Sequence, residues 1–228
     1  MRLNRNWLII SLIIIAPFLI LVSKALPQAN YLVASLYKLI YVTPIGFRLV
    51  VYKSSVKKAF SSGFKLKAFK KNFLSVLAVG LGLSLIYMTA YLIAERFLDF
   101  NYIVGRIKSY ASVDASKIML VGIYIIGINS LIEEFFWRGF VYKELAKKIR
   151  PFIVQVLTGF GFAIYHVMII YDWFNPIILG IAIFGLTGYS IIMNYIYKAY
   201  KELFACWLVH AMVDIVQILI AFRIFGLI

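Results

Sequence analysis

Long uninterrupted apolar runs constrain this chain more than any other feature. Residues 73–93 contain no charged side chain, and about 20 apolar residues in a helix suffice to cross the hydrocarbon core of a bilayer. Of the 228 residues, 64% are hydrophobic and only 14% are charged, with a mean hydropathy of +0.93. A soluble domain of this size needs more charge on its surface. We therefore predict an all-α fold, a polytopic transmembrane helix bundle.

Seven apolar segments can serve as spans, and we expect between six and eight in total. They are residues 7–22, 31–52, 73–93, 118–138, 152–170, 176–197 and 203–222. The first follows Arg2 and Arg5 like a signal peptide, but no good small-residue cleavage site follows it, so we interpret it as a retained span. The second contains Lys38, Pro44 and Arg48 and could lie partly in the membrane interface.

The basic residues cluster between the apolar segments. Residues 53–72 contain seven lysines and no acid, and basic residues also dominate 139–151 and 198–202. All three segments fall on the side of Arg2 and Arg5, so the positive-inside rule predicts a multi-pass protein of the cell membrane with a cytoplasmic N-terminus. We thus attribute the net charge of +15 to these loops and expect the lipid bilayer, not nucleic acid, as partner. Phenylalanines among the lysines of 53–72 fit either an interfacial amphipathic helix or a solvated loop.

Charged residues inside spans are costly, at roughly 2.5–3.5 kcal/mol each near a helix centre, so they should face the bundle interior or a wet cavity. Glu133, Glu134 and Arg138 lie close together near the end of the fourth segment. Glu134 and Arg138 are four residues apart and can pair on one helix face. Glu133 points about 100° away and is freer to hold a water molecule. Taken alone, this cluster could also be an interfacial salt-bridge network.

Both histidines of the chain lie inside predicted spans. His166 is in the fifth, and His210 is in the seventh, four residues before Asp214 and on the same helix face. Each could have a purely structural role, but together they allow two hydrolytic schemes. In one, Glu133 and His166 activate water by general-base chemistry. In the other, Glu133, His166 and His210 bind Zn²⁺, which acidifies a bound water.

These motifs, in this order, resemble those of the CAAX protease and bacteriocin-processing (CPBP/Abi) family, which includes the type II CAAX prenyl endopeptidases. The family pattern is Glu-Glu-x-x-x-Arg, then Phe-x-x-x-His, then His-x-x-x-Asp/Asn. Its matches are Glu133, Glu134, Arg138, Phe162, His166, His210 and Asp214. The resemblance covers the chain from residue 118 onward. It implies a catalytic intramembrane protease core in 118–228, integrated into one domain with the N-terminal membrane helices and basic cytoplasmic loop of 1–117.

The resemblance also implies roles for these residues. Glu133 and His166 would activate the attacking water, and His210 and Asp214 would stabilise the oxyanion, with Glu134, Arg138 and Phe162 in support. The prenyl-processing branch often has Asn where this chain has Asp214. An ionised Asp is a poor oxyanion donor, so Asp214 must be protonated, act through His210, or have another function such as metal binding. We favour the scheme that requires no cofactor, with Zn²⁺ as the alternative.

The implied activity is an intramembrane endopeptidase that cleaves membrane-associated, possibly prenylated, proteins or peptides. Two alternatives are a non-catalytic immunity or scaffold protein of the same fold and, less favoured, a proton-coupled transporter. The predicted span ends put Glu133 and His210 roughly 8–12 Å deep, but His166 near 20 Å, at 1.5 Å per residue. A tilted fifth helix, a later start of that helix, or a bend near Gly159 and Gly161 would each reconcile these depths.

Overall fold

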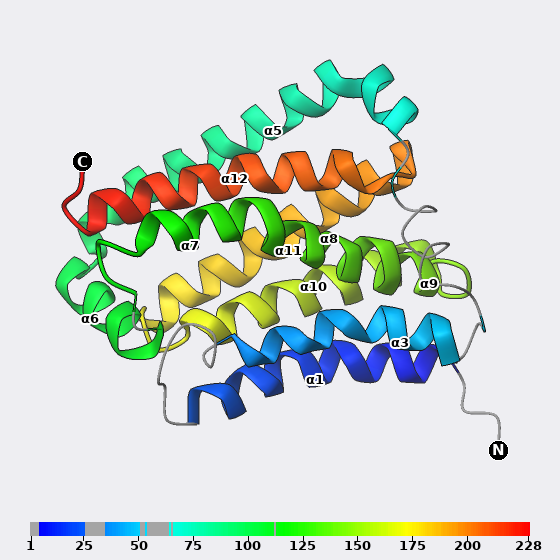
Figure 1. Cartoon of the computed structure of the whole chain (residues 1–228), viewed down its shortest axis with the longest axis horizontal. Coiled ribbons are helices and arrows are strands. Elements are labelled where there is room, and N and C mark those ends of the chain that lie inside the picture. Colours follow the sequence, from blue (N-terminus) through cyan, green and yellow to red (C-terminus); the bar gives the residue numbers. More distant parts are fainter. Residues whose placement is uncertain (1–4, 26–34, 51–52, 54–63, 65, 112) are drawn as a thin grey trace.

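The protein is a bundle of roughly parallel and antiparallel helices. The computed structural model describes residues 5–25, 35–50, 53, 64, 66–111 and 113–228, and every regular element within these residues is a helix. Helix α1 begins at one end of the bundle and α12 finishes at the other (Figure 1). Six helical segments are long and apolar enough to cross a membrane. The predicted polytopic helical bundle is therefore confirmed.

Four of these segments are single helices, namely α1 (Arg5–Ala25), α10 (Pro151–Ile170), α11 (Pro176–Tyr200) and α12 (Leu203–Ile224). A fifth is formed by α5 (Leu66–Ala94) together with the short helix that follows it, and the sixth is composite. The composite one consists of α7 (Ile118–Tyr124), η3 (Ile125–Asn129), α8 (Ser130–Phe136), η4 (Trp137–Tyr142) and α9 (Lys143–Leu145). Shorter elements are η1 (Leu36–Val42), α3 (Thr43–Val50), η2 (Glu95–Phe97) and α6 (Phe100–Ala111).

Of the second predicted span, 31–52, the structure describes residues 35–50. Its described part is the 3₁₀ helix η1 followed by α3, and its apolar stretch Leu36–Phe47 is shorter than the six spans. Pro44 lies in the first turn of α3, where its missing N–H is tolerated, and so marks the junction of the two elements. The interfacial helix considered for 53–72 falls largely on residues 54–63 and 65, outside the described part, and α5 already begins at Leu66.

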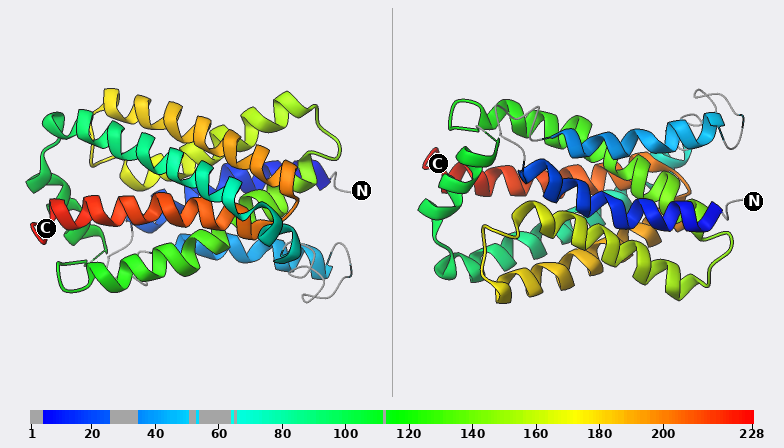
Figure 2. Two further views of the ribbon diagram at one scale, coloured as in Figure 1. Left: turned by 90° about the horizontal axis from the view of Figure 1, so that it is seen from above. Right: turned by 90° about the horizontal axis from the view of Figure 1, so that it is seen from below.

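The packing leaves an apolar outside and a tightly filled inside. On α11, Phe184 is 84% exposed and Ile177 is 77% exposed, as expected for side chains that face lipid rather than water. Inside, Phe136, Trp137 and Tyr165 are fully buried in one core that also receives residues of α1 and η1. Helix α10 packs against α1 and α11, and α12 packs along α5 (Figure 2).

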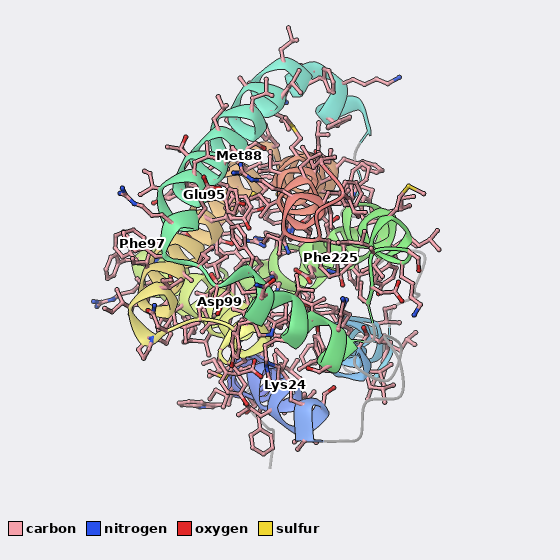
Figure 3. All side chains as sticks on the ribbon, turned by 90° about the vertical axis from the view of Figure 1, so that its left-hand side faces the viewer. Lys24, Met88, Glu95, Phe97, Asp99 and Phe225 are labelled. Carbon is pink, nitrogen blue, oxygen red and sulfur yellow. The ribbon has the colours of Figure 1, made fainter. Side chains whose placement is uncertain are left out.

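The two ends of the bundle differ in charge. Segments 143–150 and 198–201, with their lysines, lie at the end where α1 begins (Figure 1). The other end, which faces the viewer in Figure 3, has charges of both signs, including Lys24, Glu95 and Asp99. There, Asp172 in the α10–α11 turn forms ion pairs with Lys24 of α1 and Arg106 of α6. The described basic segments thus share one end of the bundle, whereas its orientation in the membrane stays a prediction.

Candidate active site

The composite helix positions the first motif at the centre of the bundle. Its α-helical part, Ser130–Phe136, is flanked by two π-helical segments, η3 and η4. Such widened turns are rare and occur frequently at functional sites. Here they accompany a helix whose inner side is strongly polar: Glu133 is 3% exposed, and Glu134 and Arg138 are fully buried.

One oxygen of Glu134 links the composite helix to α12. Its Oε1 accepts hydrogen bonds from Arg138 Nη1 at 2.8 Å and from His210 Nδ1 at 2.8 Å. The predicted Glu134–Arg138 pair therefore forms, with His210 as an additional partner. Arg138 also donates from Nη2 to Ser190 Oγ of α11, at 2.9 Å, and its guanidinium carbon lies 4.7 Å from the ring centroid of Phe162. These contacts compensate for the cost of burying the two charges.

Glu133 faces a different set of partners, namely the two histidines. Its Oε2 lies 3.3 Å from Nε2 of His166 on α10 and 4.0 Å from Nε2 of His210 on α12. Three separate helices thus bring the two imidazoles and this carboxylate together. The side chain of His166 is 22% exposed, against 5% for Glu133 and 8% for His210, so the cluster is most accessible at His166.

The hydrogen bonds made by each Nδ1 determine which nitrogen of each imidazole faces Glu133. His166 Nδ1 lies 2.9 Å from the carbonyl oxygen of Phe162, which can only accept, so Nδ1 carries the hydrogen. His210 Nδ1 donates in the same way to the carboxylate of Glu134. Both Nε2 atoms therefore point toward Glu133 Oε2. The ring of Phe162 supports this arrangement, with its centroid 4.1 Å from that of His166.

Asp214 is the fourth polar group of the cluster. Its Oδ1 lies 3.8 Å from Nε2 of His210, and the residue is 6% exposed. Because Glu134 occupies Nδ1 of His210, Asp214 is not the group that orients this imidazole through Nδ1. It faces the same side of the ring as Glu133.

The structure reconciles the depths of Glu133 and His166, whereas His210, seven residues after Leu203 at the start of α12, lies only about 10 Å from that end at 1.5 Å per residue. The fourth span continues to Leu145, seven residues beyond its predicted end. Glu133 is therefore twelve residues, or about 18 Å at 1.5 Å per residue, from that end, close to the depth of His166. Helix α10 starts at Pro151, so the later start considered for it is wrong. The mismatch arose from the boundary placed at Arg138, where a buried charge resembled a helix end.

Sequence reasoning missed three residues of the site. Asn129 donates from Nδ2 to Glu133 Oε1 at 2.7 Å, Ser190 binds Arg138, and Lys38 of η1 interacts electrostatically with Glu133 and Asp214. Asn129 could have been found as a polar residue four positions before Glu133 in an apolar run. Lys38 could have been found by the cost of a buried charge. Nothing in the sequence marks Ser190.

The fit of a metal ion can be judged from the same geometry. Among the residues that the structure describes, no group of three or more His, Cys, Asp or Glu side chains is arranged to hold a metal ion. The candidate ligands Glu133, His166 and His210 do not form such a set in this arrangement.

Comparison with known proteins finds a similarity in this part of the chain. Residues 115–216 match the family model described as type II CAAX prenyl endopeptidase Rce1-like. The match spans all three motifs and confirms the resemblance predicted from them. No significant match was found among curated proteins or among solved structures.

Proposed function

We propose, because residues 115–216 match the family model of type II CAAX prenyl endopeptidase Rce1-like proteins, that the chain is an intramembrane endopeptidase. Its substrates would be membrane-associated proteins or peptides, with or without a prenyl group, and its N-terminus would lie in the cytoplasm. The observation that carries this proposal is the convergence of Nε2 of both histidines on Glu133 Oε2, at 3.3 and 4.0 Å. These side chains come from three helices and meet at a depth where charged groups are costly.

In the proposed mechanism, Glu133 and His166 activate a water molecule. Oε2 of Glu133 takes a proton from this water, and Nε2 of His166 accepts its second hydrogen bond, since Nδ1 of His166 already donates to Phe162. The oxygen of the water then bonds to the carbonyl carbon of the scissile peptide. Glu133 afterwards transfers the proton to the leaving nitrogen as the C–N bond breaks.

His210 is proposed to stabilise the oxyanion of the tetrahedral intermediate. An imidazolium at this position can donate from Nε2, and the carboxylate of Glu134 at Nδ1 favours this cation. Asp214, beside Nε2, supports the charged imidazole when ionised or donates a second hydrogen bond when protonated. Preorganised donors of this kind contribute about 10²–10³-fold each to acyl-transfer rates.

The test is cleavage of a quenched fluorescent membrane peptide, offered with and without a farnesyl group, by the full chain in proteoliposomes. We expect Glu133→Gln and His210→Ala to lower kcat by about 10²–10⁴-fold, as is typical for loss of a general base or oxyanion donor. Glu144→Gln is a matched control, because Glu144 is another buried acid of the same composite helix but pairs with Lys147. Cleavage at the wild-type rate by a folded Glu133→Gln protein would show that the assignment is wrong.

A further inference from the structure

A pocket lies away from the candidate active site, at the basic end of the bundle. It has a volume of about 370 Å³ and opens between the ends of η4 and α9, the start of α10 and the end of α11. Lys143, Lys198 and Lys201 line it together with Tyr142 and Tyr197. None of the seven residues that match the family motifs takes part in this lining.

The charge of the pocket is of one sign. Among the described residues that line it, none is acidic. The two acids nearest in sequence have partners elsewhere: Glu144 Oε2 accepts from Lys147 at 2.7 Å, and Glu202 caps α12 by accepting from the backbone N–H of Phe204 and Ala205. Three ammonium groups around one cavity favour an anionic occupant.

The position of the pocket in the bundle indicates whether the anionic occupant comes from the membrane or from water. Three membrane-spanning segments end or begin at its rim, at Leu145, Pro151 and Tyr200. This is the level at which the hydrocarbon core gives way to lipid headgroups. The wall combines the lysines with Val154 and with two tyrosine rings, Tyr142 and Tyr197, whose centroids are 6.2 Å apart. An amphipathic ligand matches such a mixed lining better than a fully hydrated ion.

We propose that this pocket binds the phosphate headgroup of an anionic phospholipid. Basic pockets between transmembrane helices are suited to such headgroups, and each lysine near an anionic membrane surface contributes about fivefold to binding. The lipid phosphate would lie among the ammonium groups of Lys143, Lys198 and Lys201, and its glycerol and upper acyl carbons against the tyrosines and Val154. The proposal does not depend on the peptidase activity.

The experiment compares three forms of the full chain, purified in a neutral detergent. The test variant is Lys143→Gln/Lys198→Gln/Lys201→Gln. The matched control is Lys70→Gln/Lys71→Gln/Lys148→Gln, which removes the same charge from exposed lysines of the same end that do not line the pocket. Each form is titrated with phosphatidylglycerol, phosphatidylcholine, glycerol 3-phosphate or inorganic phosphate. Native mass spectrometry counts retained lipid, and the thermal unfolding midpoint reports saturation.

We expect wild type and control to retain phosphatidylglycerol in preference to phosphatidylcholine. The test variant should bind phosphatidylglycerol on the order of a hundredfold more weakly. Equal retention by the test variant and wild type would overturn the proposal. So would equal retention of both lipids by wild type, a measurement that stands even if the triple variant does not fold. Saturation by glycerol 3-phosphate or inorganic phosphate at the concentration that suffices for phosphatidylglycerol would assign a soluble ligand instead and would also overturn it.

Discussion

Glu133 and Glu134 are adjacent in the sequence, but their carboxylates have different side-chain partners. Glu134 is enclosed by Arg138 and His210, both at 2.8 Å from one of its oxygens, whereas Glu133 faces two Nε2 atoms at longer distances. A 100° step around the helix therefore separates a structural carboxylate from the one that we propose as the base. Spacing alone predicted this division, because only Glu134 has Arg138 at the i+4 position.

Removal of either partner of the Glu134–Arg138 pair should destabilise the protein strongly. Glu134→Leu or Arg138→Leu each leaves an uncompensated charge in the core, which typically costs about 3–5 kcal/mol. The double variant should lose much less than the sum of the two. Denaturant titration in bicelles, arranged as a double-mutant cycle, measures this coupling. Strict additivity would contradict the paired arrangement.

Asn129 should act as a positioning residue for Glu133. Asn129→Leu removes the 2.7 Å hydrogen bond to Oε1, and hydrogen bonds to charged groups are worth about 1.5–3 kcal/mol. If the bond holds the carboxylate in its reactive orientation, kcat for the peptide substrate should fall about 10–100-fold with little change in KM.

The control for this prediction is Asn194→Leu. Asn194 is also buried, but it donates to Gln155 and Thr158 between α10 and α11 and touches none of the proposed catalytic groups in the described contacts. We expect it to lower stability and to leave kcat near the wild-type value. A similar loss of kcat in both variants would indicate a general packing effect and contradict a specific role for Asn129.

At the scale of helices, the sequence predicted which segments exist better than where they end. All seven predicted segments contain helix, and six are long enough to span. The clear error is the end of the fourth segment, and it has a physical cause. This segment was ended at Arg138, whose charge is compensated by Glu134 on the same helix and by Ser190 through a tertiary contact. A tertiary partner such as Ser190 cannot be read from one helix.

The approach of α10 to α1 should depend on Gly161. A Cβ added there would meet Ile13 Cγ2 at 2.3 Å, so Gly161→Ala forces the two helices apart. We expect a loss of about 1–3 kcal/mol in the free energy of unfolding, as for other overpacked cores. Gly180→Ala is the matched control in α11, where an added Cβ meets nothing within 4 Å, and it should be neutral or slightly stabilising. Thermal unfolding in detergent distinguishes the two outcomes.

On the scale of the whole molecule, the distribution of charge is the main guide to orientation. The described basic segments 143–150 and 198–201 lie at the end where α1 starts (Figure 1), and mixed charges lie at the opposite end (Figure 3). The sequence predicted this separation from the loops alone. The convergence of three helices on one site could be expected only from the family resemblance, because periodicity does not tell which helices are neighbours.

The proposed orientation can be tested by labelling cysteines in intact cells. The exposed positions Lys148 and Ala115 lie at the two ends of the bundle, and the native Cys206 is buried and serves as an unreactive background. A membrane-impermeant maleimide should label Ala115→Cys in intact cells and Lys148→Cys only after lysis. The reverse pattern would place the N-terminus outside.

The residues of the site are also widely separated along the chain. This separation determines at which stage of synthesis the site can form. Glu133 comes from the middle of the sequence, whereas His210 lies on α12, the last helix of the bundle. During translation, a ribosome-bound nascent chain that has inserted the helices before α12 still lacks the imidazole that contacts Glu134. Any hydrolytic capacity would thus arise only after α12 has been inserted, so nascent chains without α12 would be inert.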